Sequence, residues 1–120
     1  KENPIIGVGT GDFPLEYNKI NKSKTPHLLN QLGPTTNPHN MYTLVWVQLG
    51  LIGIISMLSI FYYQIKLSFS STNRFYRDLG LTLPIIFLVL MFSDSYLLGH
   101  FTTLVYVYFS AFLYKDFEKN

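Results

Sequence analysis

The sequence has 120 residues, of which 48% are hydrophobic and only 13% are charged. This share of charged residues is about half of that in ordinary soluble domains, which argues against a soluble protein. The net charge of +2 and the lack of cysteine exclude a strongly basic nucleic-acid surface, a disulfide framework and a thiolate metal site.

Residues 1–40 are polar and rich in Gly, Pro and Asn, and are expected to form a loop. Gly7, Gly9 and Gly11 lie in the segment GVGTGDF. Because glycine adopts backbone conformations that other residues avoid, this spacing predicts a flexible, tightly turning segment.

A short helix is expected later in the same loop, at about residues 26–32. Thr25 would be its N-cap, Pro26 its first residue and Gly33 its stop signal. The leucines of HLLNQL share one face, so this helix is expected to lie on the membrane surface.

From Met41 the chain is almost continuously apolar, and the region 41–120 is expected to be transmembrane, because about 20 apolar residues suffice to cross a bilayer. Three spans are expected, at about 41–65, 78–93 and 97–114. The second is short and contains Pro84, so it is either a less tilted span or a partly inserted one. The polar break Ser93-Asp94-Ser95 makes the last two spans a helical hairpin.

The short loops predict the orientation. Lys66, Arg74 and Arg77 cluster between the first two expected spans, which places that loop and the C-terminus in the cytoplasm and residues 1–40 outside. The chain begins with lysine and not methionine. We therefore expect an all-α integral membrane fragment, the C-terminal part of a larger polytopic protein.

The segment NPHNMY at the start of the first span contains the candidate reactive group. Asn37 is expected to be the N-cap and Pro38 the first helical residue, with His39 and Asn40 in the first turn. Free amides and the positive end of the helix dipole favour an anion such as a diphosphate there, and they keep His39 neutral and able to accept a proton. The alternative is that His39 only caps or anchors the helix.

Other signals have two interpretations each. The amides around Gly9 and Gly11 could cradle a phosphate, although the P-loop lysine is missing and a plain turn fits equally. Asp12 could pair with Glu16 near the site, although loop carboxylates are commonly just solvated. Asp94, at the outer turn of the hairpin, is interpreted as hydrated.

Small residues recur every three positions on one face of the first span, at Gly50, Gly53 and Ser56. Because small residues let a neighbouring helix approach closely, this face is expected to pack inside the bundle.

The Gly-rich segment followed by PHNMYTLVWVQLGLIGII resembles the O-antigen ligase family of bacterial inner-membrane glycan transferases. The family pattern is a GxGxGxF segment in a periplasmic loop, followed by HNxYLxxLxxLGLxGL at the start of a late transmembrane helix. The matching residues are His39, Asn40, Tyr42, Leu49, Gly50, Leu51 and Gly53. Thr43 and Gln48 depart from it, where Leu and Glu are common. The resemblance covers about the first half of the chain well.

The resemblance implies a GT-C-like bundle and glycan transfer from an undecaprenyl diphosphate carrier to an acceptor hydroxyl, with no cofactor and no metal. His39 would take the proton of the acceptor, and Asn40 would bond the imidazole or a sugar hydroxyl. Tyr42, Gly9, Gly11 and Asp12 are the expected substrate-binding residues.

Three functions share this motif. Ligation of O-antigen to lipid A–core at the periplasmic face is the first expectation, and O-antigen polymerisation and protein O-glycosylation are the alternatives. The expected partners are the lipid bilayer, the lipid-linked donor and the hydroxyl acceptor, with no nucleic acid. A non-catalytic membrane subunit is the rival from another class, and in that case His39 would be replaceable.

Overall fold

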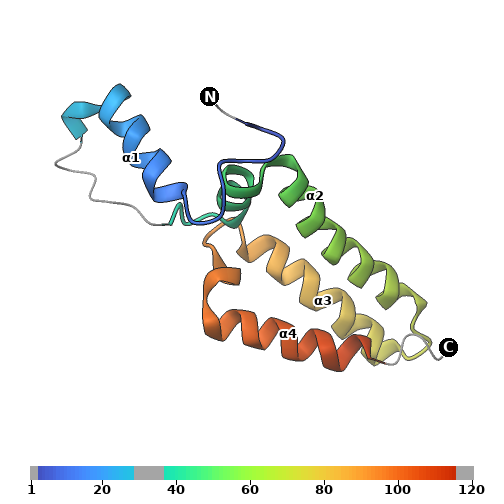
Figure 1. Ribbon diagram of the computed structural model, residues 1–120. Coiled ribbons are helices and arrows are strands. Elements are labelled where there is room, and N and C mark those ends of the chain that lie inside the picture. Colours follow the sequence, from blue (N-terminus) through green and yellow to red (C-terminus); the bar gives the residue numbers. More distant parts are fainter. Residues whose placement is uncertain (1–2, 29–36, 116–120) are drawn as a thin grey trace.

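Every regular element in the part of the chain that the computed structural model describes, residues 3–28 and 37–115, is a helix. The α-helices are α1 (Phe13–Lys24), α2 (Met41–Ser70), α3 (Arg74–Leu90) and α4 (His100–Tyr114), with 3₁₀ turns η1 (Pro26–Leu28) and η2 (Tyr96–Leu98). In Figure 1, α2, α3 and α4 form an elongated bundle, and α1 lies to one side, near the start of α2. The expectation of an all-α chain is confirmed.

Within the described residues, α2 is the one helix that is both long and apolar enough to cross a membrane, with a mean hydropathy of 2.2. It extends beyond the expected end at residue 65. α3 has 17 residues and begins and ends earlier than expected, and α4 has 15. At 1.5 Å per residue, these two helices are about 26 and 23 Å long.

α2 is interrupted at Gly50, where φ is 64° and ψ is −156°. This region of backbone space is essentially restricted to glycine. The interruption leaves backbone carbonyls before Gly50 and amides after it without their helical partners, and such groups need other partners when buried.

Residues 3–9 supply these partners, so we call this segment the N-terminal clip. Four backbone hydrogen bonds join the clip to α2: Val8 N–H to Val47 O (2.8 Å), Gly9 N–H to Gln48 O (3.0 Å), Leu51 N–H to Pro4 O (2.9 Å) and Ile52 N–H to Ile5 O (3.3 Å). The clip, which turns at residues 4–6, therefore satisfies backbone groups that the break in α2 leaves without helical partners.

The clip corrects the expected role of the small residues in α2. A Cβ atom on Gly50 would collide with the backbone of Ile5, so this glycine makes room for the clip and not for a helix. A Cβ atom on Gly53 would meet Leu49 of α2 itself, and Ser56 is exposed. The clip therefore covers this face at Gly50, which the period of three did not reveal, and the packing of the face inside a larger bundle stays a prediction.

α1 was not predicted, because its weakly apolar sequence follows a Gly-rich stretch that suggested only turns. Its start signals are Asp12 at the N-cap, a proline in the first turn and Glu16 after it. Thr25 is the C-cap of α1 and not the N-cap of a following helix. η1 begins at Pro26 as expected, and the rest of the expected helix at 26–32 lies outside the described residues.

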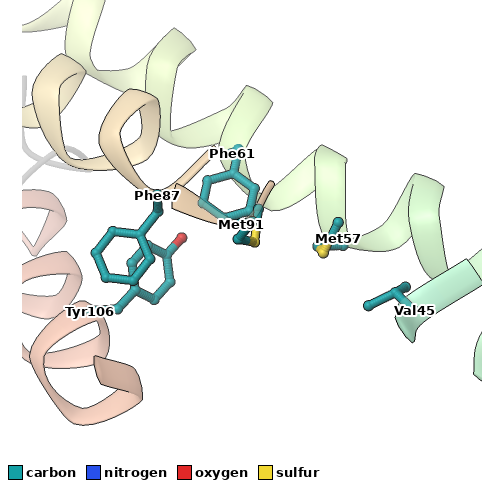
Figure 2. Close-up of a cluster of buried hydrophobic side chains, with 6 residues drawn as sticks. All are labelled: Val45, Met57, Phe61, Phe87, Met91 and Tyr106. Carbon is teal, nitrogen blue, oxygen red and sulfur yellow. The ribbon is translucent and has the colours of Figure 1, made fainter. Parts of the chain in front are cut away.

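The core of the bundle lies between α2, α3 and α4 (Figure 2). Its buried side chains are Val45, Met57, Phe61, Phe87, Met91 and Tyr106. The ring of Tyr106 lies 4.7 Å from that of Phe87 and 5.7 Å from that of Phe61, measured between centroids. One aromatic side chain of α4 therefore contacts both other helices.

A buried polar network continues from this core. The hydroxyl of Tyr106 donates to Oε1 of Gln64 at 2.8 Å, and Nε2 of Gln64 donates to Oγ of Ser110 at 3.1 Å. The network joins α2 to α4 and satisfies the amide of a glutamine that faces the interior of the bundle.

Pro84 lies inside α3, where it removes the amide that would bond the carbonyl of Gly80. The hydroxyl of Tyr114 donates to that carbonyl at 2.6 Å. The hydroxyl of Tyr114, at the end of α4, thus replaces the hydrogen bond that Pro84 removes. The carbonyl of Gly80 keeps a donor, so the proline is tolerated inside α3.

Candidate functional site

The candidate site lies at the N-terminal end of α2, where the connection between α3 and α4 meets it. Asn40 is the N-cap of α2, because its Oδ1 accepts a hydrogen bond from the amide of Thr43 at 2.9 Å. The predictions that Asn37 caps this helix and that His39 and Asn40 lie in its first turn were therefore wrong. His39 lies just outside the helix.

Asn37 forms a separate turn before the helix. Its Oδ1 accepts from the amide of His39 at 3.1 Å and from the hydroxyl of Ser95 at 2.7 Å. His39 has a φ of 50°, which is a left-handed conformation. Because that conformation cannot continue into a helix, α2 begins two residues later, and the imidazole is directed to the α3–α4 connection.

The imidazole of His39 contacts Asp94, which is 55 residues away in the sequence. His39 Nδ1 lies 3.2 Å from Asp94 Oδ1. The same carboxylate oxygen accepts from the amide of Ser95 at 2.7 Å and from Nδ2 of Asn37 at 3.4 Å. The backbone amide of Ser95 is the main reason why the pKa of Asp94 is lowered, and hydrogen bonds from His39 and Asn37 act in the same direction.

This contact assigns the two nitrogens of His39. An ionised carboxylate only accepts hydrogen bonds, so Nδ1 carries the hydrogen that points to Asp94. In the neutral ring, Nε2 then has a free lone pair and can accept a proton. The side chain of His39 is 73% exposed and that of Asp94 42% exposed, so a substrate can reach the pair.

Asp94 was missed as a site residue because a carboxylate at a turn is normally only hydrated. The available signal was an ionisable residue close to an apolar segment. Its partner could not be identified without the antiparallel packing of α2 and α3, which brings the start of one helix beside the end of the other.

Asn40 and Tyr42 connect α2 to the end of α3. Nδ2 of Asn40 donates to the carbonyl of Phe92 at 3.1 Å, and the hydroxyl of Tyr42 donates to that of Leu88 at 2.7 Å. The ring of Tyr42 also packs on Phe92, with centroids 4.5 Å apart. Both polar groups fix the geometry beside His39, and their contact with a substrate stays a prediction.

The Gly-rich segment turns tightly, as expected, with φ values of 71° at Gly7, 117° at Gly9 and 89° at Gly11. The amides of Gly7, Val8 and Gly9 all donate to backbone carbonyls. Those three amides are therefore not free to bind a phosphate, and the geometry favours the interpretation of this segment as a structural turn.

Asp12 follows these turns as the N-cap of α1, without a side-chain capping bond. Its carboxylate lies beside Gly9, close to where a Cβ atom on that residue would be. Among the described residues, no hydrogen bond joins Gly9, Gly11 or Asp12 to His39, so their role in substrate binding stays a prediction.

The described residues also contain no cluster of three or more His, Asp or Glu side chains that could hold a metal ion. Comparison of the chain with protein-family models, curated proteins and solved structures gives no match. The functional assignment therefore depends on the sequence motif and on the geometry around His39.

Proposed function

We propose that this chain belongs to a membrane glycosyltransferase that moves a glycan from undecaprenyl diphosphate to an acceptor hydroxyl, with lipid A–core as the acceptor. The observation that carries the proposal is the contact between His39 Nδ1 and Asp94 Oδ1 at the start of α2. His39 belongs to the HNxY motif that resembles the O-antigen ligase family. O-antigen polymerisation and protein O-glycosylation use the same chemistry and are the alternatives.

The proposal places α2, α3 and α4 across the bacterial inner membrane. Large apolar side chains point outward from all three helices, for example Ile52, Ile55, Ile60, Ile85, Ile86, Val89, Phe101, Leu104 and Tyr108. An outward apolar surface suits a lipid environment, because in water such a surface would be unfavourable. α3 and α4 are somewhat shorter than the bilayer core of about 30 Å, a difference that local thinning can accommodate.

The charges at the two ends of the bundle suit this topology. Lys66, Arg74 and Arg77 are near the α2–α3 connection, whereas His39 and Asp94 are at the opposite end. By the positive-inside rule, the first end faces the cytoplasm and the site faces the periplasm. A lipid-linked glycan donor at the periplasmic surface would then meet His39.

In the proposed reaction, Nε2 of His39 accepts the proton of the acceptor hydroxyl while its oxygen attacks the anomeric carbon of the glycan. The bond between that carbon and the diphosphate oxygen breaks, and undecaprenyl diphosphate leaves with the electron pair. Asp94 holds the imidazole in the reactive tautomer and stabilises its positive charge. Such general base catalysis contributes about 10²–10⁴-fold in rate.

The departing diphosphate needs positive charge or hydrogen-bond donors. Arg74 and Arg77 lie beside Asp78 at the opposite end of the bundle and cannot reach it. The resemblance implies arginines from other segments of such proteins. We therefore expect this chain to be inactive alone.

The test replaces His39 by Ala in the full-length gene at its native locus, with protein level checked in membranes. The surface glycan and the lipid-linked pool are then analysed together. His100→Ala is the matched control, because His100 lies at the same end of the bundle and makes no contact with Asp94 among the described residues.

Loss of surface glycan with long lipid-linked chains accumulating supports a ligase. Single repeat units on lipid A–core indicate a polymerase, and loss of glycoprotein alone indicates a protein glycosyltransferase. An unchanged glycan pattern in the His39→Ala strain contradicts the proposal and leaves the non-catalytic membrane subunit as the better interpretation.

A further inference from the structure

A second feature at the same end of the molecule is a hollow between α1, the N-terminal clip and the first turns of α2. Its volume is about 510 Å³, within the range of small-molecule sites. The residues that line it are Asn3, Pro4, Gly7, Val8, Glu16, Lys19, Ile20, Ser23, Trp46 and Val47. We call this hollow the α1 groove.

The wall that α1 contributes is mostly polar. Glu16, Lys19, Ile20 and Ser23 are spaced by three and four residues, so they lie on one face of the helix. A helix that packed directly on α2 would have an apolar stripe on this face. Three of these four residues are polar instead, and Phe13 is the residue of α1 that is buried. The composition of this wall suits a polar ligand better than helix packing.

The opposite wall contains Trp46, which is the one tryptophan of the sequence and is 46% exposed. Its neighbours Tyr42 and Val45 are used in packing against α3 and the core. An exposed aromatic face beside polar side chains matches the two surfaces of a pyranose. The C–H face of the sugar ring is apolar, and the hydroxyls around its edge need hydrogen-bond partners.

The charges in the groove select against an anion. Lys19 Nζ lies 3.6 Å from Glu16 Oε1, so the two charges compensate each other. The amides of Gly7 and Val8 in the clip already donate to backbone carbonyls, so they offer no phosphate cradle. A neutral ligand rich in hydroxyls can instead bond both charged side chains without separating a charge.

The position of the groove suits one part of a longer glycan. Trp46 lies five residues beyond the start of α2, which corresponds to about 7.5 Å along the helix axis. A chain of sugars could therefore extend from the groove to the end of the helix, where His39 lies.

We propose that the α1 groove binds a neutral sugar unit of the glycan, with its ring on Trp46 and its hydroxyls bonded to Lys19, Glu16 and Ser23. This inference rests on the proposed glycan transfer for its biological substrate. It concerns a different set of residues from His39 and Asp94.

The experiment uses the emission of Trp46, which reports on the groove directly because the chain has no other tryptophan. The chain is placed in lipid nanodiscs, since maltoside detergents contain the sugar chemistry under test. Free trisaccharides of hexose, N-acetylhexosamine and deoxyhexose units are added. At least one should change the emission in a saturable way and protect Trp46 from quenching by acrylamide.

Lys19→Met should weaken this binding about tenfold, as expected for the loss of a hydrogen bond to a charged group. Lys22→Met is the matched control, because Lys22 is exposed on the same helix and does not line the groove. Its binding should equal that of the unaltered chain. Circular dichroism of both variants checks that the helices remain.

The proposal is overturned if no trisaccharide gives a saturable change, or if Lys19→Met and Lys22→Met behave alike. It is also overturned if Trp46 responds to polyprenol in place of sugars, which would make the groove a lipid site.

Failure of the α1 groove can be distinguished from failure of glycan transfer. If sugars bind but the His39→Ala strain keeps its surface glycan, the groove proposal stands and the transfer mechanism fails. If sugars do not bind but the His39→Ala strain loses its surface glycan, the groove proposal fails and the transfer mechanism stands.

Discussion

The carbonyl of Ile5 occupies the space that a side chain on Gly50 would need, and it accepts a hydrogen bond from Ile52 on the far side of the break in α2. This close backbone approach explains two glycine-containing motifs together. The GVGTG segment provides the turns of the N-terminal clip, and the LGLIG segment provides the gap in α2 that the clip enters. The two motifs therefore form the two halves of one backbone contact between the clip and α2.

Gly50→Ala should destabilise the chain, because the alanine would need a backbone conformation that costs about 1–3 kcal/mol and would also collide with Ile5. We expect a lower thermal midpoint in nanodiscs, measured by circular dichroism. We also expect faster hydrogen exchange at the amides of Leu51 and Ile52.

Gly11→Ala is the matched control for this prediction. Gly11 also has a positive φ, but a Cβ atom there meets open space. Gly11→Ala should therefore show only the cost of placing an alanine at positive φ, without a collision. It should leave the hydrogen exchange of Leu51 and Ile52 unchanged. Equal effects of the two substitutions would contradict the role of the clip.

The sequence predicted the helical class and the long apolar stretch of α2 correctly, because long apolar runs and polar breaks determine them. It did not predict the break at Gly50, because the apolar run continues through it without a polar residue. A glycine in such a run is equally compatible with helix packing. The clip that makes the break favourable bonds α2 from positions 39 to 47 residues earlier in the chain.

The candidate site was predicted only in part. His39 was selected from its motif, but its placement in a helix turn was wrong, because Asn37 and Asn40 are both good caps and sequence alone does not choose between them. The choice depends on Ser95 and Phe92, which bond the two asparagine side chains from the α3–α4 connection. Such long-range partners have no local sequence signal.

Tyr114→Phe should destabilise the bundle, because it removes the donor to the carbonyl of Gly80 that Pro84 leaves without a helical partner. An unsatisfied buried carbonyl costs about 1–3 kcal/mol. Pro84→Ala restores an amide at that position. Tyr114→Phe should therefore lower the free energy of unfolding less when Pro84→Ala is present than when it is made alone.

A double-mutant cycle on unfolding in mixed micelles measures this coupling. It cancels the packing change that each substitution makes alone. If the effects of Tyr114→Phe and Pro84→Ala simply add, the hydroxyl does not replace the missing amide, and our explanation of the proline in α3 is wrong.

Gln64→Leu should also destabilise the bundle, because it leaves the hydroxyl of Tyr106 without its acceptor. Double-mutant cycles inside membrane proteins give about 0.6 kcal/mol for such hydrogen bonds, up to about 1.7. Adding Tyr106→Phe should recover part of the lost stability, since the buried hydroxyl that lost its acceptor Gln64 is then removed. No recovery would mean that the amide serves packing and not hydrogen bonding.

The carboxylate of Asp94 accepts a hydrogen bond from the amide of Ser95 and lies 3.2 Å from His39 Nδ1. Its lowered pKa means that the ionised form is favoured in the folded chain. The associated stabilisation is fully present above the ordinary pKa of 3.8 and is lost as the pH falls through the lower value of the folded state. The ¹³C shift of the Asp94 carboxyl should therefore titrate with a midpoint below 3.8.

Ser95→Pro tests the main cause, because it removes the amide that donates to Asp94, and the φ of −83° at this position is close to that of proline. The midpoint should rise in Ser95→Pro, since the backbone hydrogen bond is the largest single cause of the lowered pKa of Asp94, and it should also rise in His39→Ala. Ser95→Ala keeps the amide and is the matched control, with a midpoint near that of the unaltered chain. If Ser95→Pro leaves the midpoint unchanged, the amide of the turn does not hold Asp94 ionised.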